Sequence, residues 1–277
     1  MDSKVLAQIK ILSAESILAY EWPGSPQKAL NVDLESLSVV RHPFLATPID
    51  DDTCLLLSET GHFRALNEAG LNFFPVQMCE PDSIRVARHR LGFDTFAFDD
   101  LSRLSARHPE QIVLQEGSPK TSGPLGFVGL DFKFADGRQV QAYLRHSSRV
   151  GCPVPLEHLF RAVTQKGRYL SIVDGADNGD SLTRLARIAS TVTLPAFSLE
   201  DIKSAAQSER LFPPGLIDAA STRRILDIDF PIAVLTSNIA VSEKEAFLKD
   251  MILLRRQSRR TAVYEGQVYL LNQQMFS

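Results

Sequence analysis

The sequence predicts an α+β fold, and three stretches carry this prediction. Residues 42–77 alternate short apolar runs with polar loops and contain one short helical segment. Residues 129–144 form two alternating runs around the turn pair Asp136–Gly137, which is the pattern of a β-hairpin. Residues 154–166 have apolar side chains at helical spacing and are followed by Gly167, as expected of an amphipathic helix and its end.

The first half of the chain begins with an apolar run at residues 9–12 that predicts a strand. Helical spacing of apolar side chains then predicts a helix at 29–40. Within 42–77 we expect strands at 43–48, 54–57 and 73–78 and a helix at 63–69 with Gly70 at its C-cap. The pattern next predicts a turn and helix start at 80–83, a basic segment at 84–91 and a helix at 99–106.

Residues 115–128 are the clearest connector, because glycines and prolines recur there among Ser and Thr. We therefore expect one domain at 1–114, a linker at 115–128 and a mixed α/β domain at 129–277. The second domain should contain the hairpin, a strand at 169–173 and helices at 154–166, 181–190 and 198–207. Ser198 and Asp201 have the spacing of a capping box at the start of the last of these helices.

The composition is that of an ordinary globular protein, with 44% hydrophobic and 23% charged residues and a formal net charge of −3. This charge gives no general attraction to nucleic acid or to acidic membranes. No apolar run approaches the ~20 residues that span a bilayer, and the first residues lack the pattern of a signal peptide, so we expect a cytoplasmic protein. Cys54, Cys79 and Cys152 are widely spaced, which disfavours a disulfide framework and a structural zinc site.

The order of segments in 42–77 is specific: an apolar strand, an acidic hairpin, Leu55–Leu57, a loop, a helix containing Ala65–Leu66, Gly70, and Pro75–Gln77. Near the end of the chain come a strand-like run at 225–235, a helix at 243–254, a basic turn at 255–260 and the ending AVYEGQVYLLN. In these features the chain resembles the ParB/sulfiredoxin superfamily, and within it the free-serine kinases and their siderophore-cluster relatives. The resemblance covers about residues 7–95 and 210–272, and implies a nucleotide-binding type of N-terminal domain.

Residues 9–21 fit a segment of these kinases in which a strand leads to a His-Glu pair, with Tyr20 in the His place and Glu21 in the Glu place. In the family this Glu acts as the base on the serine hydroxyl, so the resemblance implies that Glu21 is catalytic. The chemistry requires such a group, because a hydroxyl is a poor nucleophile until a carboxylate takes its proton. From the residues alone, Glu21 is more simply a surface carboxylate before the loop that begins at Trp22.

The loop at 58–62 lies between a buried strand and a helix, where backbone N–H groups can face an anion. It takes the place of an Asp-Gly-x-His-Arg type loop in the family, and Arg64 follows it on the helix. The resemblance implies that this segment binds a nucleotide, ATP or ADP with Mg²⁺, through Ser58, Glu59, Thr60, Gly61, His62 and Arg64.

The loop departs from the family pattern in its chemistry. Ser58, Glu59 and His62 stand where the family has Asp, Gly and Arg, and Glu59 adds negative charge where phosphates should lie. A Thr-Arg-His segment of the family falls on Ile217–Ala219, and a Ser-Thr-Arg-Arg quartet follows slightly later at 221–224. The resemblance also implies that residues 213–224 face the loop.

Three functions remain open from the sequence. The first is a nucleotide-dependent kinase whose substrate is free L-serine or a related hydroxy amino acid. The second is a protein that keeps the fold but has lost phosphoryl transfer, and acts as a sensor or regulator. The third, DNA binding, has only the basic run at 255–260 in its favour, and such a run more often lies in a solvated turn at a helix C-terminus. The sequence does not determine the oligomeric state.

Overall fold

The computed structural model describes residues 6–22, 34–87, 89–117, 127–145, 154–166, 169–173, 188–194, 196–213, 216–258, 260 and 262–265. The chain forms two compact units, one of residues 1–85 and 219–277 and one of residues 86–218. It passes from the first unit to the second within β7 (Ile84–Ala87) and returns within β14 (Asp218–Ser221), and these two strands pair. The fold class is α+β, as the sequence predicted.

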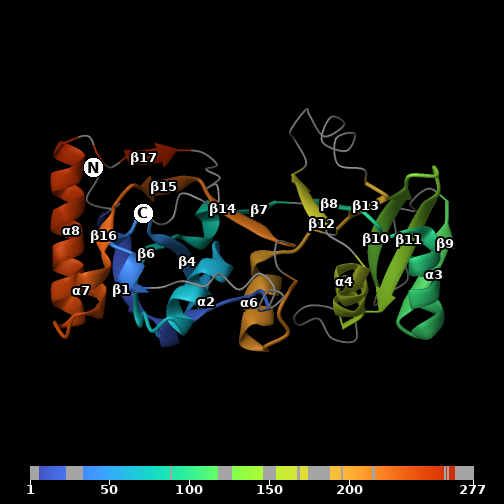
Figure 1. Ribbon diagram of the computed structural model, residues 1–277, viewed down its shortest axis with the longest axis horizontal. Coiled ribbons are helices and arrows are strands. Elements are labelled where there is room, and N and C mark those ends of the chain that lie inside the picture. Colours follow the sequence, from blue (N-terminus) through green and yellow to red (C-terminus); the bar gives the residue numbers. More distant parts are fainter. Residues whose placement is uncertain are drawn as a thin grey trace. The chain divides into compact units, whose positions relative to one another are not determined.

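Unit 1 is built on a five-stranded mixed sheet in the order β1-β6-β4-β5-β2. Figure 1 labels β1, β4 and β6 of this sheet. β1 pairs antiparallel to β6, β6 parallel to β4, β4 antiparallel to β5, and β5 parallel to β2. The strands are β1 (Ile9–Ser13), β2 (Ile17–Leu18), β4 (Phe44–Pro48), β5 (Cys54–Leu56) and β6 (Phe73–Met78). Their side chains are largely buried, which agrees with the apolar runs in the sequence.

One helix of unit 1, α2 (Thr60–Glu68), connects β5 to β6. Its Phe63 packs against Phe44 and Phe74 of the sheet, with ring centroids 6.2 and 4.7 Å away. The helix ends before Gly70, whose φ of +100° is a conformation that glycine adopts without steric cost. The predicted helix at 63–69 is therefore present and begins three residues earlier, at Thr60.

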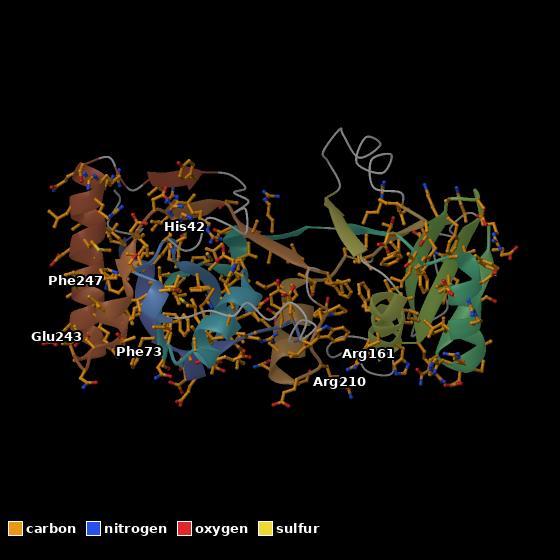
Figure 2. The ribbon with its side chains drawn as sticks, viewed as in Figure 1. His42, Phe73, Arg161, Arg210, Glu243 and Phe247 are labelled. Atoms are coloured by element: carbon orange, nitrogen blue, oxygen red, sulfur yellow. The ribbon has the colours of Figure 1, made fainter. Side chains whose placement is uncertain are left out.

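The C-terminal part of unit 1 adds α7 (Ile232–Thr236) and α8 (Val241–Gln257), and α8 packs against β1. Lys244, Leu248 and Ile252 form its buried stripe at four-residue spacing, whereas Glu243 and Phe247 are exposed (Figure 2). The buried ammonium group of Lys244 donates to Leu235 O at 2.7 Å and lies 4.3 Å from the centre of the Phe73 ring. Two short pairs complete the unit: β15 (Arg223–Leu226) with β17 (Ala262–Glu265), and β16 (Phe230–Pro231) with β3 (Val39–Val40).

Unit 2 contains a six-stranded antiparallel sheet in the order β12-β8-β13-β10-β11-β9. Its hairpin turns at Asp136 and Gly137, where Gly137 has a φ of +89°. The helices are α3 (Phe98–Arg107), α4 (Val154–Lys166) and α6 (Leu199–Gln207), and the strands are β8 (His89–Phe93), β9 (Ile112–Glu116), β10 (Phe127–Phe134), β11 (Gln139–Arg145), β12 (Tyr169–Val173) and β13 (Ser190–Thr193).

Several elements differ from the sequence prediction. Of the helix expected at 29–40, residues 29–33 lie outside the described residues, Leu34–Ser36 form a 3₁₀ turn, and Val39–Val40 form β3 because they pair with a distant strand. The helix start expected at 80–83 is a single 3₁₀ turn, Pro81–Ser83, followed directly by β7. Residues 181–187 of another expected helix lie outside the described residues, and Ser190 begins β13.

The division into units also differs from the expected domain boundary. Residues 118–126 of the expected linker lie outside the described residues, and β9 and β10 on either side of it belong to one sheet. Unit 1 instead combines both ends of the chain in one core, in which Ile225, Phe230 and Ile252 pack with residues of the N-terminal sheet.

Among the described helices, none has both the length and the apolar character needed to cross a membrane.

Candidate functional site

The parallel pairing of β2 with β5 brings Glu21 to the loop before α2. Ile17 pairs with Cys54 and Leu18 with Leu55, so the segments that follow both strands leave the sheet at the same edge. Glu21 is only 8% exposed, and its carboxylate oxygen Oε2 accepts a hydrogen bond from the hydroxyl of Thr60, the first residue of α2. The carboxylate therefore lies at the N-terminus of this helix.

Two neighbours fix the backbone around Glu21. The Tyr20 hydroxyl donates to Leu57 O at 3.3 Å, which ties this segment to the end of β5. The guanidinium of Arg64, one turn into α2, donates to the backbone oxygen of Glu21. Arg64 thus holds the main chain that carries the carboxylate, and its positive charge lies close to it.

Glu59 precedes the helix in a left-handed conformation, with φ 61° and ψ 32°. An L-residue rarely adopts this conformation, and glycine does so without penalty. The carboxylate of Glu59 forms an ion pair with Arg224 at 3.2 Å, and the two side chains are 12% and 4% exposed. Burial raises the pKa of Glu59, while the adjacent Arg224 acts in the opposite direction.

Arg224 comes from β15, far along the chain, and closes the site from the other side. Its Nη1 donates to Ser58 Oγ at 3.3 Å and its Nη2 to Pro43 O at 3.4 Å. Its Nε is buried and has no hydrogen-bond partner among the described residues. The guanidinium thus brings one buried positive charge to the loop, and the carboxylate of Glu59 already contacts it.

The first turn of α2 is open beside Gly61. A Cβ atom built on Gly61 would have no described atom within 4 Å, so there is space next to the helix N-terminus. The first helical hydrogen bond runs from Phe63 N to Glu59 O at 3.0 Å. The N–H groups of the helical residues before Phe63 therefore have no acceptor within the helix. The helix N-terminus can therefore present N–H groups to an anion.

His62 differs from the other residues of the loop. Its side chain is 6% exposed, and burial lowers the pKa of its imidazole below 6.5. Burial thus favours the neutral form at pH 7, whereas a phosphate is better met by a cation.

No group of three or more His, Cys, Asp or Glu side chains is arranged to hold a metal ion in the described part of the chain. The site offers two carboxylates, Glu21 and Glu59. Mg²⁺ is usually held by one or two carboxylates together with substrate phosphates and water. These carboxylates fit a Mg²⁺ ion that arrives with a nucleotide better than a resident ion.

The structure thus brings together Glu21, Ser58, Glu59, Thr60 and Arg64 of the predicted site, and it adds Arg224. The sequence pointed to the quartet at 221–224 but assigned no role to it. A local pattern does not reveal that Arg224 contacts Ser58, because 166 positions separate the two residues. The expectation that residues 213–224 face the loop is met at Arg224.

No protein-family model and no curated protein sequence matches the chain. Solved structures do match it. A C-terminally truncated SbnI from Staphylococcus aureus aligns with a TM-score of 0.70 and 16% identity, covering 91% of this chain and 98% of that truncated chain. A glutamate-to-alanine variant of free serine kinase in complex with ADP aligns with a TM-score of 0.60 and 14% identity, covering 82% of this chain and 94% of the kinase.

This chain shares their fold. A further free serine kinase variant, in complex with AMP, aligns with a TM-score of 0.62 and 13% identity over 82% of this chain and 94% of the kinase. The resemblance inferred from the sequence, to free-serine kinases and a siderophore-cluster relative, is thus confirmed at the level of the fold.

Proposed function

We propose that the chain is a nucleotide-dependent kinase of small molecules, which transfers a phosphoryl group from ATP or ADP to free L-serine or a related hydroxy amino acid. One observation carries this proposal: the hydrogen bond from Thr60 holds the buried carboxylate of Glu21 at the N-terminus of α2. A base for the acceptor hydroxyl and N–H groups for the phosphates are thereby adjacent. Nucleotides and free amino acids are cytoplasmic metabolites, which agrees with the compartment expected from the sequence.

In the proposed reaction, the carboxylate of Glu21 takes the proton of the serine hydroxyl. The hydroxyl oxygen forms a bond to the terminal phosphorus of the nucleotide, while the bond from this phosphorus to the bridging oxygen breaks. O-phosphoserine and the shortened nucleotide are the products. The amides of Thr60 and Gly61 and the guanidinium of Arg224 stabilise the negative charge on the transferring group. Mg²⁺ bound with the nucleotide supplies the remaining charge neutralisation.

The solved structures support the nucleotide part of this proposal. Free serine kinase, whose fold this chain shares, was solved with ADP and with AMP. At 13–14% identity the shared fold does not carry the substrate with it, so the amino-acid acceptor belongs to the proposal. Its support is the position of Glu21 next to the helix N-terminus.

A second function is favoured by the Glu59–Arg224 ion pair. The carboxylate of Glu59 contacts the cation that a phosphate would need, and it lies where it would repel a phosphate. A chain with this pair can retain a ligand pocket without transferring phosphate, and would then act as a sensor or regulator. The two functions differ in whether O-phosphoserine is formed.

Two measurements test the proposal. The first is calorimetric titration with ATP and with ADP, each with Mg²⁺ and with or without L-serine. The second is a direct assay for O-phosphoserine. We expect nucleotide binding by the wild type and by Glu21→Gln. The rate of O-phosphoserine formation should fall about 10²–10⁴-fold in Glu21→Gln, as expected for loss of a general base. Glu15→Gln, at an exposed position of the same segment, is the matched control and should behave as the wild type.

Three outcomes decide between the functions. Nucleotide binding with O-phosphoserine formation that depends on Glu21 supports the kinase. Nucleotide binding without any O-phosphoserine supports the sensor. A chain that binds neither nucleotide contradicts the proposal.

A further inference from the structure

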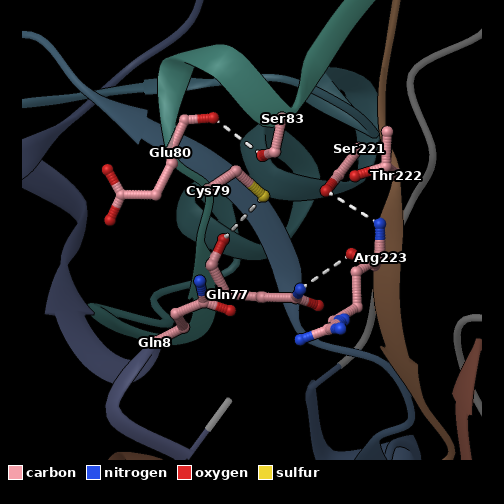
Figure 3. Close-up of a pocket in the computed structure, with 8 residues that line it drawn as sticks. All are labelled: Gln8, Gln77, Cys79, Glu80, Ser83, Ser221, Thr222 and Arg223. Atoms are coloured by element: carbon pink, nitrogen blue, oxygen red, sulfur yellow. Dashed lines mark hydrogen bonds between the residues drawn. The ribbon is translucent and has the colours of Figure 1, made fainter. Parts of the chain in front are cut away.

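The guanidinium of Arg224 reaches the loop at 58–62 from a strand that is anchored at both ends. Arg224 is the second residue of β15, and its side chain is 4% exposed. At the start of the strand, Gln77 Nε2 donates to Arg223 O at 2.9 Å (Figure 3), and Gln77 Oε1 accepts from Ile225 N at 2.9 Å. These bonds tie β15 to β6, so the position of Arg224 then depends on what holds the other end of the strand.

The segment just before β4 holds that other end. Asp227, which follows the last residue of β15, donates from its backbone N to Nδ1 of His42 at 3.0 Å. The backbone N–H groups of Ile228 and Asp229 both donate to Arg41 O, at 2.8 and 3.1 Å. Asp227 and Asp229 have positive φ angles of 55° and 42°, a conformation that L-residues rarely adopt. The turn after β15 therefore depends on its hydrogen bonds to this segment to keep its shape.

The same segment also contacts the guanidinium itself. Arg224 Nη2 donates to Pro43 O at 3.4 Å, and Pro43 directly follows His42 in the chain. The proline ring fixes the φ angle of Pro43, which leaves little freedom between the imidazole and this carbonyl oxygen. A displacement of His42 is thus passed on to a contact of Arg224 as well as to the end of its strand.

His42 contributes to this arrangement through one atom. Its side chain is buried, Nδ1 accepts the bond from Asp227, and Nε2 has no hydrogen-bond partner in the described part of the chain. Burial lowers the pKa of His42 below 6.5, and the guanidinium groups of Arg224 and Arg41 lower it further. The carboxylates of Asp227 and Asp229 act in the opposite direction. At pH 7 the imidazole is therefore neutral, with its proton on Nε2 and with Nδ1 as an acceptor.

We propose that His42 is a positioning residue for Arg224. Its neutral imidazole fixes the end of β15 at Asp227, and thereby keeps the guanidinium within reach of Ser58 and Glu59 at the loop. This inference rests on the proposed function, because there Arg224 meets the negative charge of the transferring phosphoryl group. A proton on Nδ1 would place two hydrogen-bond donors against each other, so the acceptor is lost once His42 is protonated.

Calorimetric titration with ATP and Mg²⁺ compares two replacements of His42. In His42→Leu the acceptor is lost, and we expect the affinity for ATP to fall about threefold to tenfold, the range expected for one hydrogen bond. His42→Asn is the matched control, because its side-chain oxygen can accept in place of Nδ1 and its side chain does not titrate. The affinity of His42→Asn at pH 7.5 should lie within about twofold of that of the wild type.

The pH profile separates the role of the imidazole from a general loss of structure. As the pH falls from about 7.5 to about 5.5, protonation of His42 should weaken the binding of ATP to the wild type. The ratio of the wild-type affinity to the affinity of His42→Asn should therefore fall over this interval. Other groups that titrate, including the nucleotide, are common to both chains and cancel in this ratio.

A double-mutant cycle shows whether His42 acts through Arg224. The background is Glu59→Gln/Arg224→Gln, because removing Arg224 alone would leave a buried carboxylate without its partner. In this background His42→Leu should change the affinity for ATP by less than about twofold. The same cycle can be measured without nucleotide as the free energy of unfolding in urea. There His42→Leu should cost less stability in the background than in the wild type.

Three results would each overturn the proposal. The first is an affinity of His42→Leu for ATP equal to that of the wild type. The second is a ratio of wild-type to His42→Asn affinity that does not change with pH. The third is a loss of affinity in His42→Leu that is equally large in the Glu59→Gln/Arg224→Gln background.

Failure of the kinase proposal has a different signature. If neither the wild type nor any variant binds a nucleotide, the kinase proposal fails and the unfolding cycle alone decides the role of His42. Equal losses of stability from His42→Leu in the two backgrounds then contradict the positioning of Arg224, and a smaller loss in the Glu59→Gln/Arg224→Gln background supports it.

Discussion

Glu59 is the residue that most distinguishes this site from a simple anion-binding loop. It has a positive φ of 61°, which an L-residue adopts at a cost of roughly 1–2 kcal/mol. Its buried carboxylate contacts Arg224. The side chain therefore holds in place a conformation that glycine would adopt more easily.

The two effects of Glu59 can be separated with Glu59→Gly and Glu59→Ala. Both variants lose the ion pair, but only glycine relieves the left-handed conformation, so Glu59→Gly should be more stable than Glu59→Ala by about 1 kcal/mol. Urea unfolding measures this difference. Equal stabilities of the two variants would contradict the conformational part of the argument. Both variants should bind ATP with Mg²⁺ more tightly than the wild type, because the repulsive carboxylate is gone.

Two buried histidines make stability depend on pH. Burial lowers the pKa of both His42 and His62 below the ordinary value of 6.5. As the pH falls through about 6.5, the unfolded chain therefore binds protons that the folded chain does not, and the free energy of unfolding decreases. Urea unfolding at a series of pH values should show this decrease between pH 7.5 and 5.5. The double variant His42→Gln/His62→Gln should show a smaller slope, and an unchanged slope would refute the assignment.

At the scale of elements, Gln77 joins two strands from opposite ends of the chain. Its side chain makes two hydrogen bonds to the backbone of β15, with Arg223 O and Ile225 N. Replacing it with leucine leaves both backbone groups without these partners, and each buried group left unsatisfied costs about 1–3 kcal/mol.

We therefore expect Gln77→Leu to lower the free energy of unfolding by about 2–4 kcal/mol. Gln139→Leu, at an exposed position of β11, is the control and should change stability by less than about 0.5 kcal/mol. Urea denaturation of both variants gives the comparison. A loss in Gln77→Leu no larger than in the control would show that the two hydrogen bonds do not hold β15 in place.

At the scale of the whole molecule, unit 1 is assembled from both ends of the chain. Its core combines the N-terminal sheet with Ile225, Phe230, Leu248 and Ile252. α8 packs against β1, and Glu245 Oε1 accepts from Ile11 N at 3.1 Å. The N-terminal sheet thus depends on segments that the chain adds only after completing unit 2.

A fragment of residues 1–114 should therefore fail to fold on its own. We expect it to lack a cooperative unfolding transition, whereas a chain in which residues 1–85 are joined to 219–277 by a flexible Gly/Ser linker should retain one. Circular dichroism during urea titration distinguishes these outcomes. Cooperative unfolding of the 1–114 fragment would favour the domain boundary at 115–128 that the sequence suggested.

Local patterns in the sequence were sufficient for most elements. Most of the expected elements lie close to their expected positions. The bounds agree to within one residue for β1, β4, β5, β6, β11 and α4, and β10 begins two residues earlier than expected. Apolar runs, turn pairs such as Asp136–Gly137 and a helix-ending glycine act over a few neighbouring residues, so they can be read without knowledge of the fold. Pairs such as β3 with β16 could not be read this way, because the partner of Val40 is Phe230.

The sequence by itself determined the α+β class and the strand-loop-helix unit around residues 42–77, and its resemblance to the free-serine kinases suggested Glu21 and this loop as a candidate site. The tertiary structure decided that the carboxylate of Glu21 is buried against Thr60, that Arg224 meets Glu59, and that both ends of the chain form one core. The physical reason is the range of the interactions. Secondary structure follows from neighbouring residues, whereas an ion pair or a shared core depends on where a distant segment of the chain returns.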